Sequence, residues 1–334
     1  MNDNSTDVLQ SQVPNFNFMT AKDRIAQGIS PPRPLVGNLL FRKTIAGLTA
    51  PEDSHKTNCA TQLAICLSLG IPCYSYSCKK SQVAYLVLEG GEDYILERLE
   101  EKIEAMGVNR DEALQGIYIL DCPSMQLDDE ATAQRLKQNL LDLNPRPEVV
   151  ILDPITYALN EDVRYSPNKT KLVRNSLEIA KVLDGVVLLI VHTRKGAKDN
   201  ADMDDFLGSG QIARAAATRI KLYRKDNRVN MYVKVRHSER PNPLSLVWKH
   251  PLLEVEQEIL RPREEAKAAI LQALENAPYN IKATVLGELV RQVAQSTEHN
   301  EKTVRAAITN LEVEGKVEIL RVQDSATKVV KLVE

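Results

Sequence analysis

A lysine followed by a threonine, Lys56-Thr57, lies between an apolar run and a helical pattern, and these two residue types can hold phosphate and Mg²⁺. In a phosphate-binding loop, backbone N–H groups surround the phosphates, the lysine neutralises them and the hydroxyl holds the metal ion. The N-terminus of the following helix adds positive potential at the same point. The candidate nucleotide-binding residues are Ala50, Pro51, Ser54, His55, Lys56, Thr57 and Asn58.

This loop departs from the pattern G-x-x-x-x-G-K-[ST] at both glycines, which are replaced by Ala50 and His55. The first change is tolerable because Pro51 follows it. If His55 needs a positive φ, the backbone penalty is about 1–2 kcal/mol, and its side chain would crowd the path of the phosphates. Glu52 and Asp53 also repel phosphate. Taken alone, the motif leaves open a polar loop with a chance Lys-Thr pair.

Apolar strand patterns alternate with helical patterns along the chain, which favours a parallel α/β sheet. Ligands of such sheets bind at the carboxyl ends of the strands. One predicted helix has Ile95, Leu96, Leu99 and Ile103 on a common face. Strands are predicted at residues 42–49, 83–88, 117–120, 149–153, 186–191, 219–223, 229–235 and 244–248, and further helices at 19–28, 59–69, 129–142, 170–183 and 212–217.

Polar residues lie at the ends of three of these strands, and each suits a step of phosphate chemistry. Asp153 could hold Mg²⁺ together with Thr57, and Glu89 could orient or deprotonate the water that attacks a γ-phosphate. His192 could sense that phosphate. Taken singly, each of the three has an ordinary alternative, as a strand-terminating aspartate, a neighbour of a helix N-cap or a satisfied histidine.

Two cations, Lys234 and Arg236, alternate along a strand and therefore share a face. Such a pair at a strand end suits a finger that reaches the phosphates of a neighbouring subunit. The ordinary alternative is a solvated face.

In chain order the motifs are Ala-Pro-x-x-x-x-Lys-Thr, Leu-Glu with an arginine nine residues later at Arg98, Ile-Leu-Asp-Pro, Val-His-Thr-Arg-Lys-Gly, Leu-Gly-Ser-Gly and Lys-x-Arg. Over roughly residues 30–250 this set resembles the RecA-like ATPases of the hexameric replicative helicase group, above all the plasmid RepA-like helicases and their AAA-ATPase relatives. The resemblance implies a RecA-like fold, ATP and Mg²⁺ as ligands, and a ring hexamer with ATP sites between subunits. It also implies four catalytic residues, namely Glu89 as carboxylate, His192 as γ-phosphate sensor, and Lys234 and Arg236 as trans-acting fingers.

The C-terminal residues show a different pattern, with helices predicted at 264–276, 283–293 and 301–314 and a hairpin of residues 316–322 and 328–333. Three helices and a hairpin resemble a small α+β winged-helix domain, whose third helix enters the major groove of DNA. Candidate DNA contacts on that helix are Lys302, Thr303 and Arg305. From residue 263 onward there are ten Lys and Arg and eleven Asp and Glu, so a protein-binding winged helix is the alternative.

The domain organisation predicted for the 334 residues is a disordered tail (1–18), a RecA-like domain (19–255), a linker (256–263) and a winged-helix domain (264–334). The net charge of −2 means that any contact with nucleic acid must be local. No apolar run approaches the ~20 residues that span a bilayer, and residues 1–18 lack the features of a signal peptide. The five cysteines are therefore expected to be reduced thiols in a cytoplasmic protein without membrane contacts.

The expected function is that of an ATP-dependent, DNA-associated motor or switch of a plasmid, phage or other mobile element, acting as a homo-oligomer. One alternative is a non-hydrolysing DNA-binding protein of replication initiation or regulation, with a decayed nucleotide site. Another is a transcription regulator in which the ATPase domain only oligomerises the winged helix.

Overall fold

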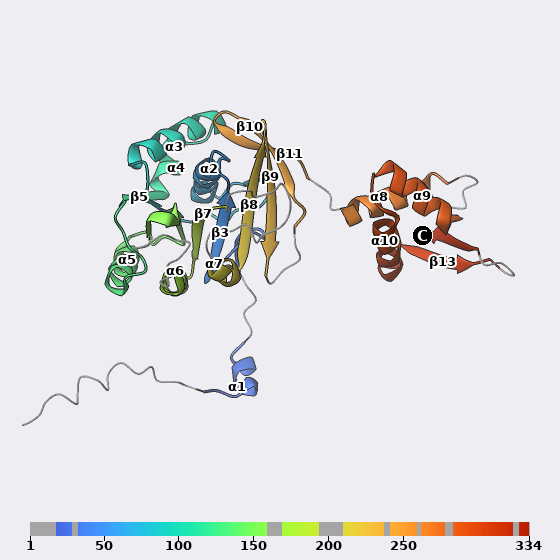
Figure 1. The fold of residues 1–334 in the computed structure, drawn as a ribbon. Coiled ribbons are helices and arrows are strands. Elements are labelled where there is room, and N and C mark those ends of the chain that lie inside the picture. The colour runs from blue at the N-terminus through green and yellow to red at the C-terminus, as the bar shows by residue number, and fades with distance from the viewer. Residues whose placement is uncertain are drawn as a thin grey trace, which may run out of the picture. The chain divides into compact units, whose positions relative to one another are not determined.

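Strand β3 (Thr44–Ala50) lies inside a nine-stranded sheet and leads directly into the Lys-Thr loop (Figure 1). In this computed structural model the strand order is β11-β10-β9-β8-β3-β7-β6-β4-β5. The structure describes residues 18–28, 33–158, 169–193, 210–236, 241–258, 262–277, 283–322 and 327–333.

Six neighbouring strands of this sheet run parallel: β8 (Thr218–Lys225), β3, β7 (Val186–His192), β6 (Val149–Asp153), β4 (Val83–Val87) and β5 (Ile117–Asp121). Their carboxyl ends meet at one edge, where Ala50 is paired with His192 and Val87 with Asp153. The remaining strands, β9 (Arg228–Val235), β10 (Leu244–Lys249) and β11 (Leu252–Glu258), pair antiparallel. The predicted α/β fold with a mostly parallel sheet is therefore confirmed.

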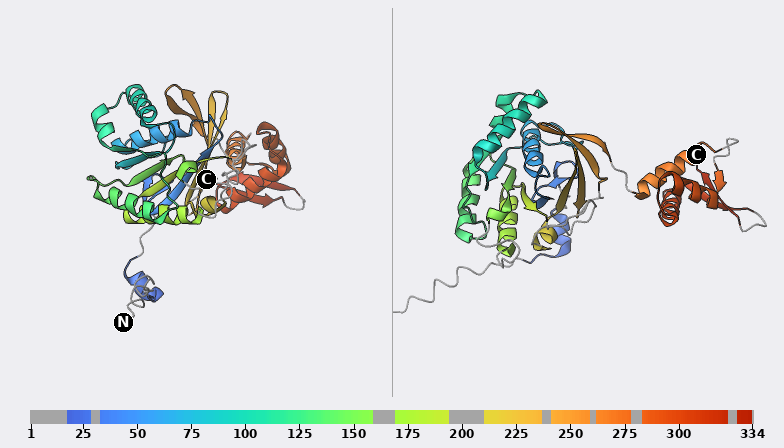
Figure 2. Two further views of the ribbon diagram at one scale, coloured as in Figure 1. Left: turned by 60° about the vertical axis from the view of Figure 1, so that its left-hand side comes forward. Right: turned by 45° about the horizontal axis from the view of Figure 1, so that its top comes forward.

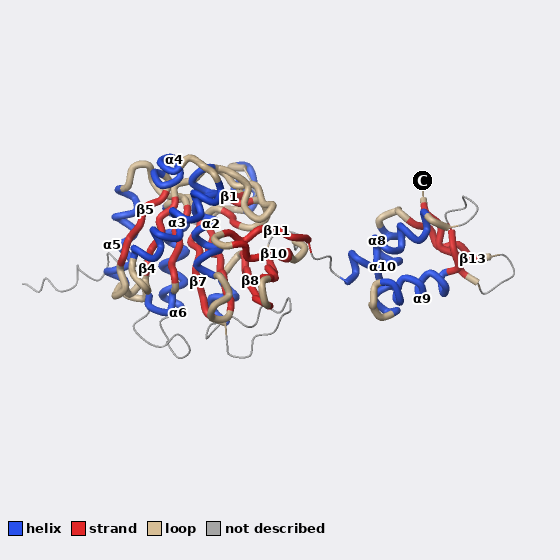
Figure 3. The backbone as a smooth tube through the Cα atoms, turned by 90° about the horizontal axis from the view of Figure 1, so that it is seen from above, coloured by secondary structure: helices blue, strands red, loops and turns tan. Residues whose placement is uncertain are grey.

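Helices cover both faces of the sheet (Figures 2 and 3). Because side chains alternate across a strand, Ala46 and Leu48 of β3 join one apolar core and Ile45 joins the other. The first core contains α2 (Lys56–Leu69), α3 (Glu92–Met106) and α4 (Arg110–Gln115). The second contains α5 (Glu130–Asp142), the 3₁₀ helix η2 (Ile155–Ala158), α6 (Lys169–Val182) and α7 (Gly210–Ala215).

Some local predictions differ from the structure. Leu96 is 39% exposed, whereas Ile95, Leu99 and Ile103 are the apolar residues that α3 buries. Residues Ala283–Val285, expected to begin a helix, form strand β12, which pairs with β14 (Lys328–Leu332). Strand β11 was not predicted and extends into the residues expected as a linker. Helix α4 and the hairpin of β1 (Pro34–Val36) and β2 (Leu40–Phe41) were also not predicted.

The C-terminal residues have their own apolar core, which includes Ile270, Leu289, Val304 and Ile308. It is formed by α8 (Pro262–Glu275), β12, α9 (Leu286–Ser296), α10 (Glu301–Val313), β13 (Val317–Arg321) and β14 (Lys328–Leu332). The three strands pair in the order β12-β14-β13. Helix α10 begins where predicted, because the Asn300 side chain accepts a hydrogen bond from the Thr303 N–H at 2.9 Å.

The chain divides into two compact units, Met1–Arg33 and Pro34–Glu334. The first contains α1 (Ala21–Ala26), capped by Thr20 as predicted. The other predicted tail residues, 1–17, and the polar segment 197–205 lie outside the described residues. Within the described residues no helix combines the length and apolar character needed to cross a bilayer. All five cysteines are free thiols, as expected.

Candidate nucleotide-binding site

The loop between β3 and α2 has an unusual residue at the position of the second glycine. His55 has φ 62° and ψ 28°, the left-handed conformation that glycine adopts readily and that costs other residues about 1–2 kcal/mol. Its ring stacks on Trp248 of β10, with the ring centroids 4.3 Å apart and the planes at 25°. His55 therefore has the positive φ that was considered as a condition for its backbone penalty, and its ring, which was expected to crowd the phosphates, contacts Trp248 outside the loop.

Asn58 in the first turn of α2 fixes the other side of the His55 ring. Its Oδ1 accepts hydrogen bonds from Arg98 and from Lys102 Nζ, the latter at 2.9 Å, so its amide nitrogen faces His55 Nδ1 at 3.2 Å. Nδ1 is thus the acceptor, and the ring proton resides on Nε2. Burial, and then the charges of Arg224, Arg98 and Lys102, lower the pKa of His55 to about 4. The ring is therefore neutral at neutral pH.

The Lys56 ammonium lies against the end of β3. Its Nζ donates hydrogen bonds to the carbonyls of Ala50, at 3.1 Å, and Pro51, at 2.8 Å. Burial lowers the pKa of Lys56, while the Asp153 carboxylate opposes this shift. Within the described chain, no backbone hydrogen bond outside the helices and strands is donated by the N–H groups of residues 55–57. These free N–H groups beside a lysine suit a bound anion.

The carboxylate of Asp153 at the end of β6 is buried next to the loop. Its Oδ2 accepts a hydrogen bond from the Tyr85 hydroxyl at 2.6 Å. Burial raises the pKa of Asp153, and hydrogen bonds from Tyr85 and Thr57 together with the charge of Lys56 oppose the rise. The Thr57 hydroxyl and the Asp153 carboxylate are therefore adjacent, and both are oxygen ligands of the kind that Mg²⁺ takes.

The residues present fit Mg²⁺ held jointly by protein and phosphate. Among the described residues no group of three or more His, Cys, Asp or Glu side chains could hold a metal ion alone. Mg²⁺ in nucleotide sites usually takes only one or two protein ligands and completes its shell with phosphate oxygens and water. Thr57 and Asp153, beside the free N–H groups of the loop, match that arrangement.

His192 and Glu89 complete the polar edge of the sheet. The Nδ1 atom of His192 is buried without a hydrogen-bond partner in the described structure. Burial, and then the charge of Lys56, lower the pKa of His192. Glu89 is exposed, accepts a hydrogen bond from the Tyr157 hydroxyl at 3.1 Å, and is close enough to influence the pKa values of Asp153 and His192.

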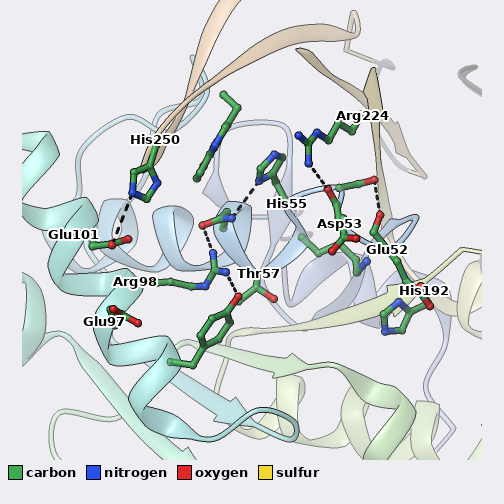
Figure 4. Close-up of a pocket in the computed structure, with 15 residues that line it drawn as sticks. Glu52, Asp53, His55, Thr57, Glu97, Arg98, Glu101, His192, Arg224 and His250 are labelled. Carbon is green, nitrogen blue, oxygen red and sulfur yellow. Dashed lines mark hydrogen bonds and ion pairs between the residues drawn. The ribbon is translucent and has the colours of Figure 1, made fainter. Parts of the chain in front are cut away.

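His192 and the loop residues 52–58 border a cavity of about 710 Å³, whereas Glu89 and Asp153 are not among its lining residues (Figure 4). Glu52 and His192 lie toward one end of the cavity and His250 and Glu101 toward the other, with His55 between them. The loop, α3 and the ends of β7, β8 and β10 supply the lining, which consists of Glu52, Asp53, Ser54, His55, Lys56, Thr57, Asn58, Tyr94, Glu97, Arg98, Glu101, His192, Arg224, Trp248 and His250.

Several groups in or beside this cavity were not predicted from the sequence. Tyr85, Lys102, Arg224 and Trp248 have no motif, and their positions depend on how α3 and the antiparallel strands pack. The only available signal was that Trp248 is the single tryptophan of the chain.

Two sets of predicted residues lie away from the cavity. Lys234 is paired with Arg219 on β8, and the Arg236 N–H bonds to the Ala217 carbonyl at 2.9 Å, beside the start of β3. Both cations are exposed at the edge of the sheet opposite the loop of their own chain. Lys302, Thr303 and Arg305 belong to α10 of the C-terminal domain.

A family model described as AAA domain matches residues 11–198, more than half of the chain. This chain belongs to the AAA domain family. Membership supports the prediction of a RecA-like, ATP-binding P-loop NTPase domain. The AAA domain chain is also similar to the crystal structure of the RadB recombinase, with 17% sequence identity, a TM-score of 0.48 and coverage of 66% of this chain and 93% of that one. A search of curated proteins gives no match.

Proposed function

We propose that this chain is an Mg²⁺-dependent ATPase that acts as a DNA-associated motor or switch, of the type of the RepA-like replicative helicases of plasmids, phages and other mobile elements. The observation that supports this most is the meeting of Lys56, Thr57, Asp153 and His192 at one edge of the sheet, beside a loop with free N–H groups. The five free thiols fit a cytoplasmic location.

Each residue at this edge has a distinct role in the proposal. Bound Mg-ATP supplies the phosphoanhydride bond that is hydrolysed. Lys56 would exchange the carbonyls that it now contacts for phosphate oxygens, and Thr57 and Asp153 would hold the metal ion. Glu89 would orient or deprotonate the attacking water, and the unpaired Nδ1 of His192 would sense the γ-phosphate.

The positions of Lys234 and Arg236 support a role in trans within a ring hexamer. Both lie at the edge opposite their own loop, so they suit the phosphates of a neighbouring subunit. Arg236→Ala should remove hydrolysis and keep ATP binding. Mixing this variant with Lys56→Ala should restore part of the activity, because a mixed interface then holds one intact loop and one intact finger. Failure of the mixture to recover any activity would contradict the trans role.

The test of the central proposal is ATP binding and hydrolysis by the intact chain, with and without DNA. The parent should bind Mg-ATP and hydrolyse it faster with DNA, and Lys56→Ala should lose binding by more than about tenfold, since a charge-assisted contact to phosphate is removed. Lys181→Ala, which removes an exposed lysine from α6, is the matched control and should behave like the parent. A parent that binds no nucleotide would refute the proposal.

A second candidate function is a nucleotide- or DNA-binding protein that does not hydrolyse ATP. The exposed Glu52 and Asp53 in the loop, and the exposure of Glu89, favour it. The two candidates differ in one comparison, the hydrolysis rate of the parent against that of Glu89→Gln. If the parent binds ATP but hydrolyses it no faster than Glu89→Gln does, the protein is a nucleotide-binding switch that does not hydrolyse ATP.

We assign DNA binding to the C-terminal domain, as a winged helix with α10 in the major groove. Lys302 and Arg305 are exposed on its first turns, and the Arg305 side chain forms an ion pair with Glu301 of its own helix at 3.4 Å. Arg305→Ala and Lys302→Ala should each weaken duplex binding and lower the salt slope by about one. Arg135→Ala on α5 is the matched control. Unchanged affinity and slope in both variants would exclude this helix.

A further inference from the structure

His55 lies at a position of the loop where a glycine would adopt the left-handed conformation without strain. Trp248, which is nearly two hundred residues away in the sequence, contacts the ring of His55. We propose that Trp248 is a positioning residue of the nucleotide-binding loop, which acts by stacking on His55 and holding that residue in its left-handed conformation. The proposal rests on the proposed nucleotide-binding function and extends it, because it makes the β10–β11 hairpin a part of the site.

The need for support follows from the backbone of His55. A side chain with φ near +60° is strained, and the strain persists only where surrounding contacts over-determine the conformation. The Trp248 stack covers one side of the ring, and the hydrogen bond from Asn58 fixes its Nδ1 edge. In glycine the same conformation carries no strain, so a glycine here would need neither contact.

The hairpin that carries Trp248 is itself tied to the helices beside the loop. The Gln62 side chain of α2 donates to and accepts from the backbone of Leu253, with both hydrogen bonds at 2.9 Å. The buried Lys102 of α3 donates to the Pro251 carbonyl at 2.7 Å, and its Nζ also binds the Asn58 Oδ1 that orients the amide toward His55. Trp248 and Asn58 are therefore held within one network.

This arrangement predicts that Trp248 affects nucleotide affinity only through His55. A double-mutant cycle of Trp248→Ala, His55→Gly and the double variant separates this role from direct contact with a nucleobase. In the parent background, Trp248→Ala should weaken Mg-ATP binding about two- to tenfold, the range for one aromatic stack. In the His55→Gly background, the same substitution should have no effect.

A second readout needs no nucleotide. The Cys59 amide donates to the His55 carbonyl at 2.8 Å, so its hydrogen exchange reports the conformation of the loop; it should be faster in Trp248→Ala than in the parent, and equal in His55→Gly and the double variant. Trp248 is the only tryptophan, so its fluorescence in the parent reports the stack directly and should change in His55→Gly. Tyr118→Ala, which removes a half-buried aromatic from β5 at the far edge of the sheet, is the matched control and should leave loop exchange unchanged.

The outcomes separate the two proposals. A parent that binds no nucleotide refutes the proposed function, whereas the exchange experiment still tests the role of Trp248. Equal exchange in the parent and Trp248→Ala, or an equal loss of affinity in both backgrounds, would overturn the positioning role. If Trp248→Ala does not fold, Trp248→Leu removes the stack with a smaller loss of volume, and the same cycle applies.

Discussion

The hydrogen bond between Tyr85 and Asp153 joins two buried groups, so Tyr85→Phe should be more disruptive than the loss of one oxygen suggests. The two oxygens are 2.6 Å apart, Tyr85 is fully buried and Asp153 is 6% exposed. Burial raises the pKa of Asp153, and the tyrosine hydroxyl opposes that rise more than the Thr57 hydroxyl or the Lys56 charge does. The variant therefore leaves a buried carboxylate with only its two weaker supports.

The magnitude follows from the charge of the acceptor. A hydrogen bond to a charged group contributes about 1.5–3 kcal/mol, and the phenylalanine ring retains the packing, so we expect the free energy of unfolding to fall by about 2 kcal/mol at neutral pH. Without the hydroxyl, the pKa of Asp153 rises further above its unfolded value. A carboxyl with a raised pKa favours the folded state in acid, so the difference from the parent should shrink toward about pH 4.

Urea unfolding followed by circular dichroism, at neutral pH and near pH 4, measures both effects. Tyr118→Phe is the matched control, because its exposed hydroxyl donates to the neutral Pro145 carbonyl and its loss should change stability by less than about 0.5 kcal/mol. An unchanged free energy of unfolding for Tyr85→Phe at neutral pH, or the same loss at both pH values, would refute the reasoning.

Three further predictions concern groups that hold the fold around the site. Gln62→Ala leaves a buried N–H and C=O of Leu253 unpaired and should cost about 2–4 kcal/mol, seen as a lower melting temperature; an unchanged one would contradict it. The pKa of His55 is about 4 in the folded protein and 6.5 in the unfolded chain, so the unfolded chain takes up the proton first as pH falls. The free energy of unfolding should therefore decrease as pH falls from 6.5 toward 4. Unfolding measured against pH should show this loss in the parent and not in His55→Gly, and equal profiles would count against it. Gly185→Ala places a Cβ 2.0 Å from the Glu148 carbonyl oxygen, so urea unfolding should show a loss of about 1–3 kcal/mol, whereas parent-like stability would show that this approach can relax.

The central parallel strands could be predicted because they are buried on both faces and are therefore continuous apolar runs, as in Val149–Asp153 and Val186–His192. The meeting of Asp153 and His192 was predictable for a related reason, since parallel strands place their carboxyl ends at one edge. The predicted roles of these residues remain proposals that the experiments above test.

The surroundings of the loop could not be predicted, because they are made by contacts between distant residues. Lys102 reaches Asn58 only because of the way α3 packs on α2, and Trp248 reaches His55 only because the antiparallel strands return to the carboxyl edge. No periodicity in the sequence encodes either contact. The strand Ala283–Val285 was not predicted for a similar reason. Its pairing with β14 determines its extended conformation, although in the sequence it leads directly into the helical pattern of α9.

The position of β3 in the sheet has a consequence for synthesis of the chain. This strand is translated before both of its neighbours, which are residues 186–192 and 218–225. Until both have left the ribosome, β3 exposes unpaired apolar edges of the kind that promote aggregation. The residue that stacks on the loop emerges later still, in β10. A nascent chain that ends before β10 should therefore gain less stability from nucleotide as a folding ligand, although its loop sequence is already complete.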